Sequence, residues 1–423
     1  MRNLRTLLLL NLVLMGTATT CSTLQGGKFD WPQWRGPDRT DVSKETGLLA
    51  AWPEPGPRLL WTFKDAGLGF ASFAVVGDHL YSMGASKGTE VLYAVDLKTR
   101  QRLWSAEVGN QFGHDRGDGP RGTPTVDGNR VYGIGGQGNL ACVDVMTGKK
   151  VWSKGLKTDL GGSQMSGWGY SESPLVDGDL VLAMPGGDQG TVAAFDKKTG
   201  ELKWRSTELK DKAGYSSLVV AVLGGIRQYV LMTGDSVAGV AAADGKLLWR
   251  FARASRTAAV PTPIVKDNYI YVTSGYGVGC ALLQITPKGA GFNVEEVYAN
   301  KGMTNHHGGV VLLGDHLYGY SDTGGWTCQE FKTGKVVWAS KKLGKGCVTS
   351  ADGHLYCYDE RDGTCVLAEA SPNGWKETGR FKIQQTKLDR KRGQIWSHPV
   401  VANGKLYLRD QDLIFCYDVS KAQ

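Results

Sequence analysis

The feature that most restricts the fold of this 423-residue chain is a unit that it repeats along most of its length. The unit consists of an apolar stretch, a turn, a second strand and the pattern Ala-x-Asp-x-x-Thr-Gly-x-x-x-Trp. Its tryptophans Trp104, Trp152, Trp204 and Trp249 follow at steps of 48, 52 and 45 residues, and Trp338 comes two periods later. Because one such unit is too small to bury a core alone, this period predicts a ring or array of stacked units.

The residue types of the unit indicate four short antiparallel strands, which is typical of a β-propeller blade. Thr-Gly supplies a hairpin turn with positive φ, and the preceding Asp accepts backbone N–H groups across that turn. We expect the Trp to lie on the outer strand and to bury its ring against the next blade. The 59 glycines of the chain fall mostly in short clusters, as many tight turns require.

The last unit, Ser397 to Asp418, has three strands and ends without its tryptophan. The segment Leu59 to Phe63 has the pattern of the missing outer strand, and pairing the two would remove two exposed sheet edges. The sequence therefore predicts an all-β fold, an eight-bladed β-propeller of four-stranded antiparallel blades whose last blade is closed by the N-terminal strand. Seven blades remain the alternative if the degenerate stretch from Cys347 to Ile383 is not a blade of its own.

These units resemble the pyrroloquinoline-quinone (PQQ) repeat, and the resemblance covers the chain from Leu59 to Asp418. It implies an eight-bladed ring of the kind shared by quinoprotein alcohol dehydrogenases, BamB-type lipoproteins of outer-membrane assembly and many bacterial propellers of unknown role. The opening Asp30 to Pro37 looks like the start of that last envelope group. We expect its Trp31 and Trp34 to anchor the N-terminal arm to the side of the propeller.

The N-terminus has the character of a secretory leader. Two arginines precede an apolar run from Leu7 to Met15, which is too short to span a bilayer and is followed by small residues. We expect residues 1–20 to be a signal peptide, 21–58 an arm and 59–423 the propeller. The protein would be exported to the periplasm or cell surface, and it would be membrane-attached only through a lipid on Cys21.

Polar and aromatic residues collect in the segments that lead into the first strand of each blade. In a propeller these segments converge on one face, around the mouth of the central channel. A concave site with aromatic rings, imidazoles and arginines is where a ligand is expected. The candidate binding residues are Arg121, Trp168, Tyr170, Glu172, Arg256, His307, Trp396 and His398. The alternative is that such residues only satisfy backbone carbonyls of the crowded inner strands.

Histidine spacing gives no metal motif. His306 and His307 are adjacent, so on a strand their side chains would point to opposite sides, and we expect at most one of them to face the channel. No other pair of residues has the spacing of metal ligands.

The cysteines follow the repeat. Cys142, Cys328, Cys357 and Cys416 each precede an acidic residue by two positions, in the slot that alanine fills in other units, so we expect small buried apolar side chains there. A hairpin turn midway between Cys357 and Cys365 would place them face to face. A cross-strand disulfide and two free thiols are both open at this point.

Taken together, the sequence favours a binding scaffold in the cell envelope rather than an enzyme. Its partner would be an envelope protein or a small-molecule or carbohydrate ligand held at the channel mouth, and we expect a monomer. The net charge of +8, from 49 basic and 41 acidic residues, is far from the charge of a nucleic-acid-binding protein.

The alternative function is a PQQ-dependent alcohol or sugar dehydrogenase. The resemblance implies that such an enzyme holds its quinone between a Trp and a disulfide of adjacent cysteines, beside Ca²⁺ and a catalytic Asp. This sequence has no two adjacent cysteines and no obvious carboxylate cluster for the cation. We therefore expect no cofactor, with PQQ and Ca²⁺ as the alternative.

Overall fold

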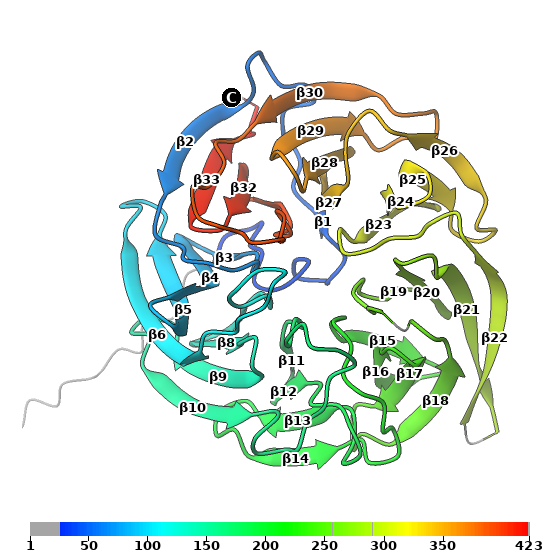
Figure 1. The fold of residues 1–423 in the computed structure, drawn as a ribbon. Helices are drawn as coiled ribbons and strands as arrows, with labels where there is room; N and C mark the ends of the chain where they lie inside the picture. Colours follow the sequence, from blue (N-terminus) through cyan, green and yellow to red (C-terminus); the bar gives the residue numbers. More distant parts are fainter. Residues whose placement is uncertain (1–25, 256, 290, 422–423) are drawn as a thin grey trace, which may run out of the picture.

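The computed structural model describes residues 26–255, 257–289 and 291–421 and shows a ring of eight sheets around a central channel (Figure 1). The predicted signal peptide, residues 1–20, and Cys21 lie outside the described residues. The described part of the chain contains no helix long and apolar enough to cross a bilayer. The predicted eight-bladed all-β propeller is confirmed.

Each blade has four antiparallel strands, numbered outward from the channel. Blade 1 contains β3 (Ala74–Val76), β4 (His79–Ser86), β5 (Thr89–Asp96) and β6 (Arg102–Asn110). Blade 2 contains β7 (Thr125–Asp127), β8 (Arg130–Ile134), β9 (Asn139–Asp144) and β10 (Lys150–Gly155). Blade 3 contains β11 (Leu175–Asp177), β12 (Leu180–Ala183), β13 (Ala193–Asp196) and β14 (Leu202–Arg205). Blade 4 contains β15 (Val219–Leu223), β16 (Ile226–Met232), β17 (Ser236–Ala241) and β18 (Leu247–Ala252).

The second half of the ring repeats this plan. Blade 5 contains β19 (Ile264–Lys266), β20 (Tyr269–Ser274), β21 (Gly279–Lys288) and β22 (Gly291–Asn300). Blade 6 contains β23 (Val310–Leu313), β24 (His316–Ser321), β25 (Gly325–Glu330) and β26 (Val336–Ser340). Blade 7 contains β27 (Gly346–Ala351), β28 (His354–Asp359), β29 (Thr364–Glu369) and β30 (Glu377–Lys382). Blade 8 contains β31 (Val400–Ala402), β32 (Lys405–Asp410), β33 (Leu413–Asp418) and, from the N-terminal end, β2 (Arg58–Phe63).

Ring closure follows the sequence prediction. Strand β2 pairs antiparallel with β33, with Trp61 opposite Cys416, so the first and last parts of the ring share one sheet. The degenerate stretch is a complete blade 7, which gives eight blades rather than seven. Blade 7 also takes a fifth, inner strand, because β1 (Val42–Ser43) pairs parallel with β27.

The repeat tryptophans lock neighbouring blades together. Trp104 on β6 packs against Gly148 in the turn between β9 and β10, where a Cβ would lie only 2.6 Å from the indole. The Trp104 Nε1 donates a hydrogen bond of 3.1 Å to the carbonyl of Val145 in the same turn. Trp152 meets Gly200 of the following blade in the same way, at 2.7 Å. The predicted burial of each ring against the next blade is confirmed for these pairs.

Of the two alternatives that the sequence left open for Cys357 and Cys365, the structure shows two free thiols and no disulfide. In the hairpin of β28 and β29, Cys357 stands opposite Val366 and Cys365 stands opposite Tyr358, so the register differs by one residue from the one that a disulfide requires. The two thiols are free, and all seven described cysteines are buried. Cys357 also lies on the second strand of its blade rather than in the alanine slot of the third strand.

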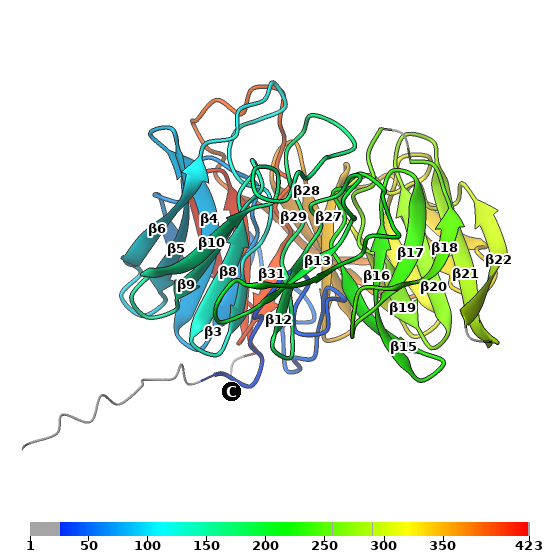
Figure 2. The ribbon, with the colours of Figure 1, turned by 90° about the horizontal axis from the view of Figure 1, so that it is seen from below.

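The N-terminal arm crosses the channel instead of packing on the side of the ring, which corrects the sequence expectation for Trp31 and Trp34 (Figures 1 and 2). It hydrogen-bonds to every blade, because the inner strands present free polar groups to the axis. In blade order the contacts are Trp31 to Val75, Pro32 to Val126, Arg39 to Ser173, Arg39 to Leu218, Arg35 to Thr262, Arg35 to Val310, Asp41 to Ser350 and Glu45 to Gly404.

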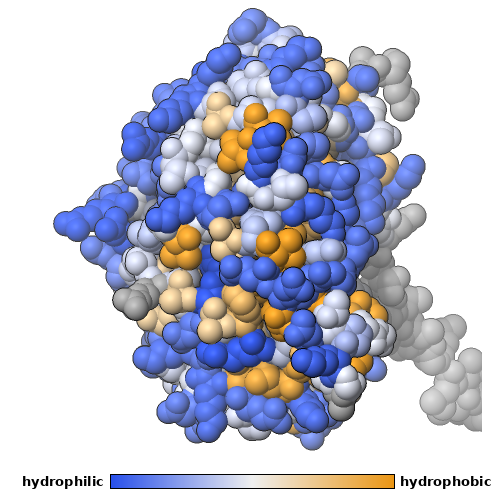
Figure 3. All heavy atoms as spheres, turned by 90° about the vertical axis from the view of Figure 1, so that its right-hand side faces the viewer, coloured by the Kyte–Doolittle hydropathy of each residue, from blue (hydrophilic) through white to orange (hydrophobic). Residues whose placement is uncertain are grey.

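The outer wall is mixed in character. On the side that carries β22 and β26, apolar residues lie in small separate groups among hydrophilic ones (Figure 3). Val297 and Val336 on these outer strands are 41% and 39% exposed. Single exposed apolar residues of this kind are normal for a protein surface, so this side shows no large apolar patch.

Candidate functional site

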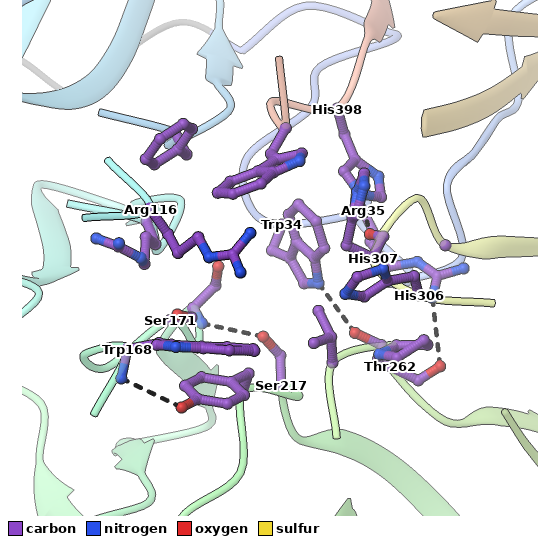
Figure 4. Close-up of a pocket in the computed structure, with 18 of the residues that line it drawn as sticks. Trp34, Arg35, Arg116, Trp168, Ser171, Ser217, Thr262, His306, His307 and His398 are labelled. Carbon is purple, nitrogen blue, oxygen red and sulfur yellow. Dashed lines mark hydrogen bonds between the residues drawn. The ribbon is translucent and has the colours of Figure 1, made fainter. Parts of the chain in front are cut away.

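A pocket opens at one end of the channel, and the N-terminal arm forms its floor (Figure 4). Because strands alternate in direction, the segment before the first strand of a blade and the loop between its second and third strands lie at the same end. Seven of the eight lead-in segments contribute to the lining, and Trp34 and Arg35 of the arm close it from below. The cavity volume is about 200 Å³.

Five of the eight candidate residues line this pocket, and they come from four different lead-in segments. They are Arg121, Trp168, His307, Trp396 and His398.

The other three candidates are not in the lining. Tyr170 is 2% exposed and donates a 3.0 Å hydrogen bond to the carbonyl of Pro185. Glu172 is also 2% exposed, and its Oε1 accepts a hydrogen bond from the backbone N–H of Met184. Both side chains therefore serve the packing of blade 3. Arg256 lies outside the described residues.

Two groups of aromatic rings face the pocket. Trp168 and Tyr215 are stacked, with ring centroids 5.8 Å apart and an interplanar angle of 23°. Phe70 and Trp396 form a second group, with centroids 4.9 Å apart. These rings offer flat apolar surfaces to a bound molecule, since aromatic faces pack well against rings and sugar faces.

The charged groups in the lining are basic. Arg121 donates hydrogen bonds of 2.7 and 2.9 Å to the carbonyls of Gly119 and Gly117, and its guanidinium lies 4.7 Å from the ring centroid of Phe112. Burial lowers the pKa of Arg121 to about 10, which leaves it cationic at neutral pH. Arg116 is exposed at the rim. Among the described residues that line the pocket, none is Asp or Glu.

Both adjacent histidines line the pocket, so the expectation that at most one would face the channel is wrong. His306 and His307 precede β23 in a loop, where side chains do not alternate as they do on a strand. Their ring centroids are 5.3 Å apart. Burial, and then the neighbouring His307 and Lys345, lower the pKa of His306 to about 3, so this imidazole is neutral at physiological pH.

His307 is held by a carboxylate that sequence reasoning missed. Its Nε2 lies 2.6 Å from Oε2 of Glu360, which also accepts a 3.1 Å hydrogen bond from the indole N–H of Trp396. Burial lowers the pKa of His307, but its contacts with Cys347 and Glu360 raise that pKa by a larger amount. The pKa of His307 therefore lies above its usual value. These two contacts therefore favour the protonated form of the His307 imidazole.

Two of the missed residues share an origin. Tyr276, a lining residue, follows β20, and Glu360 follows β28, so both lie in loops between second and third strands. Sequence reasoning searched only the lead-in segments, although the strand alternation places these loops at the same face. Trp34 was missed as a lining residue because the arm was expected on the side of the ring.

The Ca²⁺ and quinone arrangement that the resemblance implies for a dehydrogenase does not fit this site. Within residues 26–255, 257–289 and 291–421, no group of three or more His, Cys, Asp or Glu side chains is placed to hold a metal. The chain also lacks two adjacent cysteines. No reaction step is therefore assigned to such a group.

Comparison with known proteins agrees with the fold. The family model described as outer membrane protein assembly factor BamB matches residues 45–169 and 87–340. A BamB of Burkholderia pseudomallei is 25% identical over 267 residues, which cover 60% of this chain and 64% of the relative, so the match spans less than two thirds of that protein. A BamB of Shewanella oneidensis is 23% identical over 357 residues, covering 72% of this chain and 85% of the relative.

Solved structures show the same architecture. The crystal structure of BamB from Moraxella catarrhalis matches with a TM-score of 0.61 at 16% identity, covering 86% of this chain and 98% of that one. The quinohemoprotein alcohol dehydrogenase of Comamonas testosteroni matches with a TM-score of 0.63 at 13% identity, covering 93% of this chain and 81% of the other. At these identities the likeness concerns the fold alone.

Proposed function

The chain belongs to the family of the outer membrane protein assembly factor BamB, and from this membership we propose that it is an exported binding scaffold of the cell envelope. Residues 1–20 are the leader in this proposal, 21–58 the arm and 59–423 the propeller. The scaffold has an envelope protein as partner, and the pocket at its channel mouth binds an anionic group carried by that partner or by a small ligand such as an acidic sugar.

The observation that carries the pocket proposal is its lining. Arg35, Arg116 and Arg121 face the cavity together with six aromatic rings, and no described carboxylate lines it. Arg35 is neutralised by Asp41 at 2.9 Å in a buried ion pair. Arg121, in contrast, directs its guanidinium N–H groups to backbone carbonyls, so its charge remains available to a ligand. An arginine beside an aromatic ring suits a carboxylate attached to a flat apolar group.

Titration with matched probes tests this proposal. Tryptophan fluorescence and thermal shift are measured with D-galacturonate and with neutral D-galactose. We expect the acid to bind at least about 10-fold more tightly, and Arg121→Gln to weaken its binding by about 10-fold, since a charge-assisted hydrogen bond contributes about 1.5–3 kcal/mol. The matched control is Arg100→Gln, which changes an exposed arginine in the turn between β5 and β6. Equal binding of both sugars, or of neither, contradicts the pocket proposal.

A second candidate function is a PQQ-dependent alcohol or sugar dehydrogenase. It is favoured by the combination of Trp168 and Trp396 with Arg121 around one pocket, which suits a flat molecule with carboxylates. Absorbance during titration with PQQ and Ca²⁺, followed by dye reduction with alcohols and sugars, distinguishes the two functions. Turnover would replace the scaffold proposal, whereas the absence of both a spectral change and turnover would reject the dehydrogenase.

A further inference from the structure

One cysteine differs from the other described cysteines in its surroundings. Cys142, Cys328, Cys365 and Cys416 lie among apolar side chains, and burial raises the pKa of each thiol well above its usual value. Cys347, on β27, is equally buried, with no exposed surface. Its neighbours are polar and titratable, however, and they belong to the pocket wall.

Cys347 is the first member of a chain of three polar groups. Its Sγ lies 3.8 Å from Nδ1 of His307 and 3.7 Å from the carbonyl oxygen of Trp396. The other ring nitrogen of His307, Nε2, lies 2.6 Å from Oε2 of Glu360. A thiol, an imidazole and a carboxylate in this order form a path for the thiol proton, since the carboxylate orients the ring and stabilises its charged form.

A second imidazole adds positive charge. His398 is 4% exposed, its Nε2 donates a 3.1 Å hydrogen bond to the carbonyl of His307, and its Nδ1 lies 3.4 Å from Oδ2 of Asp41. Burial lowers the pKa of His398, but Cys347 and Asp41 raise it more, to about 10. Burial raises the pKa of Cys347, yet the charges of His398 and His307 outweigh it and bring the pKa to about 7.

From this constellation we propose that Cys347 is a redox-sensitive thiol in the pocket wall, oxidised to a sulfenic acid by hydroperoxides that enter the pocket. His307, Trp396 and His398 line the cavity and also lie next to the thiol, so a displacement of these side chains would open the thiol to a water-sized oxidant. The site is independent of the anionic ligand proposed above.

The reaction balances with hydrogen peroxide as the oxidant. The thiol proton passes to His307, and the sulfur attacks one peroxide oxygen. The S–O bond forms while the O–O bond breaks, and the leaving hydroxide takes the proton from the His307 imidazolium to become water. Sulfur loses two electrons and the peroxide gains them, so that one thiol and one peroxide give one sulfenic acid and one water.

The test uses the six other described cysteines as internal controls. The purified native protein is treated with hydrogen peroxide and dimedone at pH 7, and labelling of each cysteine peptide is followed by mass spectrometry. Cys328 and Cys357 are as fully buried as Cys347, so these two thiols serve as controls for the access of peroxide to a buried thiol. The difference under test is the pair of imidazoles beside Cys347. We expect Cys347 to be labelled at least about 10-fold faster than either, since the thiolate is the reacting form.

Variants and the pH dependence of labelling test whether the neighbouring imidazoles make Cys347 react fast. His307→Gln is expected to lower the labelling rate of Cys347 by about 10-fold, while Cys357→Ala leaves it unchanged. In the native protein the rate should rise with pH and level off above about pH 7, the pKa of Cys347. This profile needs no variant to fold. Labelling of Cys347 no faster than that of Cys328, or a rate that still rises steeply at pH 9, overturns the proposal.

Discussion

Glu172 shows how a residue chosen as a ligand from the sequence serves the fold instead. It is 2% exposed, and its Oε1 accepts the backbone N–H of Met184. Burial raises the pKa of Glu172 to about 8, and the hydrogen bond from Met184 and the charge of Arg39 offset this only in part. The carboxyl group is therefore mostly protonated at neutral pH, because the interior penalises its charged form.

This raised pKa predicts a pH dependence of stability. A carboxyl group whose pKa is higher in the folded than in the unfolded state stabilises the fold fully below the unfolded pKa, and it loses that contribution as pH rises through about 8. Glu172→Gln keeps an acceptor for Met184 but cannot ionise. We expect the variant to become more stable relative to the native protein as pH rises from 5 to 9, measured by urea denaturation at pH 5, 7 and 9. A difference that does not change with pH would contradict the assignment.

At the level of single residues, the sequence predicted which types would be buried but not how they would be oriented. Cys357 is buried as expected, and Cys365 is buried as well, yet a register shift of one residue places Val366 and Tyr358 opposite them. Such a shift moves each side chain to the other face, and the turn that sets it has no repeated motif. Orientation in irregular turns is decided by local geometry that one sequence does not contain.

At the scale of elements, the contact between an outer-strand ring and the next turn is the unit that repeats around the ring. In blade 5, Tyr298 stands where other blades have tryptophan, and it packs on Gly334 of blade 6. Its hydroxyl donates a 2.9 Å hydrogen bond to the carbonyl of Phe331 in the neighbouring turn. A different ring thus makes the same contact, which explains why a degenerate repeat still forms a complete blade.

This contact predicts that the free energy of unfolding depends strongly on Gly148. Gly148 has φ +68° and its Cβ position lies 2.6 Å from Trp104, whereas Gly128 in the same blade has φ +55° and nothing within 4 Å. Gly128→Ala should cost about 1–2 kcal/mol through the backbone alone. Gly148→Ala should cost about 1–3 kcal/mol more, because the indole must also move. Chemical denaturation of both variants measures the difference, and equal losses would show that the indole contact contributes little.

Elements with a motif were predictable, and elements without one were not. The Thr-Gly turns, the outer strands and the closing strand β2 were all located from the repeat. The loops between second and third strands differ in length and sequence from blade to blade, so Tyr276 and Glu360 gave no signal, although topology places them at the pocket end. Their position follows from strand direction, which holds for every blade.

At the scale of the whole molecule, two separate devices hold the ring together. Strand β2 completes blade 8, and the arm hydrogen-bonds to all eight blades, at their inner strands or at residues next to those strands. Arg39 alone donates to the carbonyls of Ser173 and Leu218, in blades 3 and 4. The repeat period predicted the first device. It did not predict the second, because an arm outside the repeat has no period that relates it to the ring.

Two truncated chains separate the contribution of the arm from that of β2. A chain that starts at Arg58 lacks the arm but keeps β2, and we expect a folded monomer with a lower melting temperature, since buried carbonyls on the axis lose their donors. A chain that starts at Lys64 also lacks β2 and leaves β33 as a free edge. We expect this second chain to self-associate, as unpaired edges do. Light scattering with thermal denaturation compares the two, and a monomeric second chain as stable as the first would contradict the role of β2.

The arm enters the ring at the end opposite to the pocket. Phe29 donates to the side chain of Asn403, and Asp30 accepts from the N–H of Gly77, both in turns between first and second strands at that end (Figure 2). If the chain is tethered to a surface through its N-terminus, the end of the channel where the arm enters faces that surface. The pocket end of the channel then faces away from the surface, and incoming molecules reach the pocket without passing the tether.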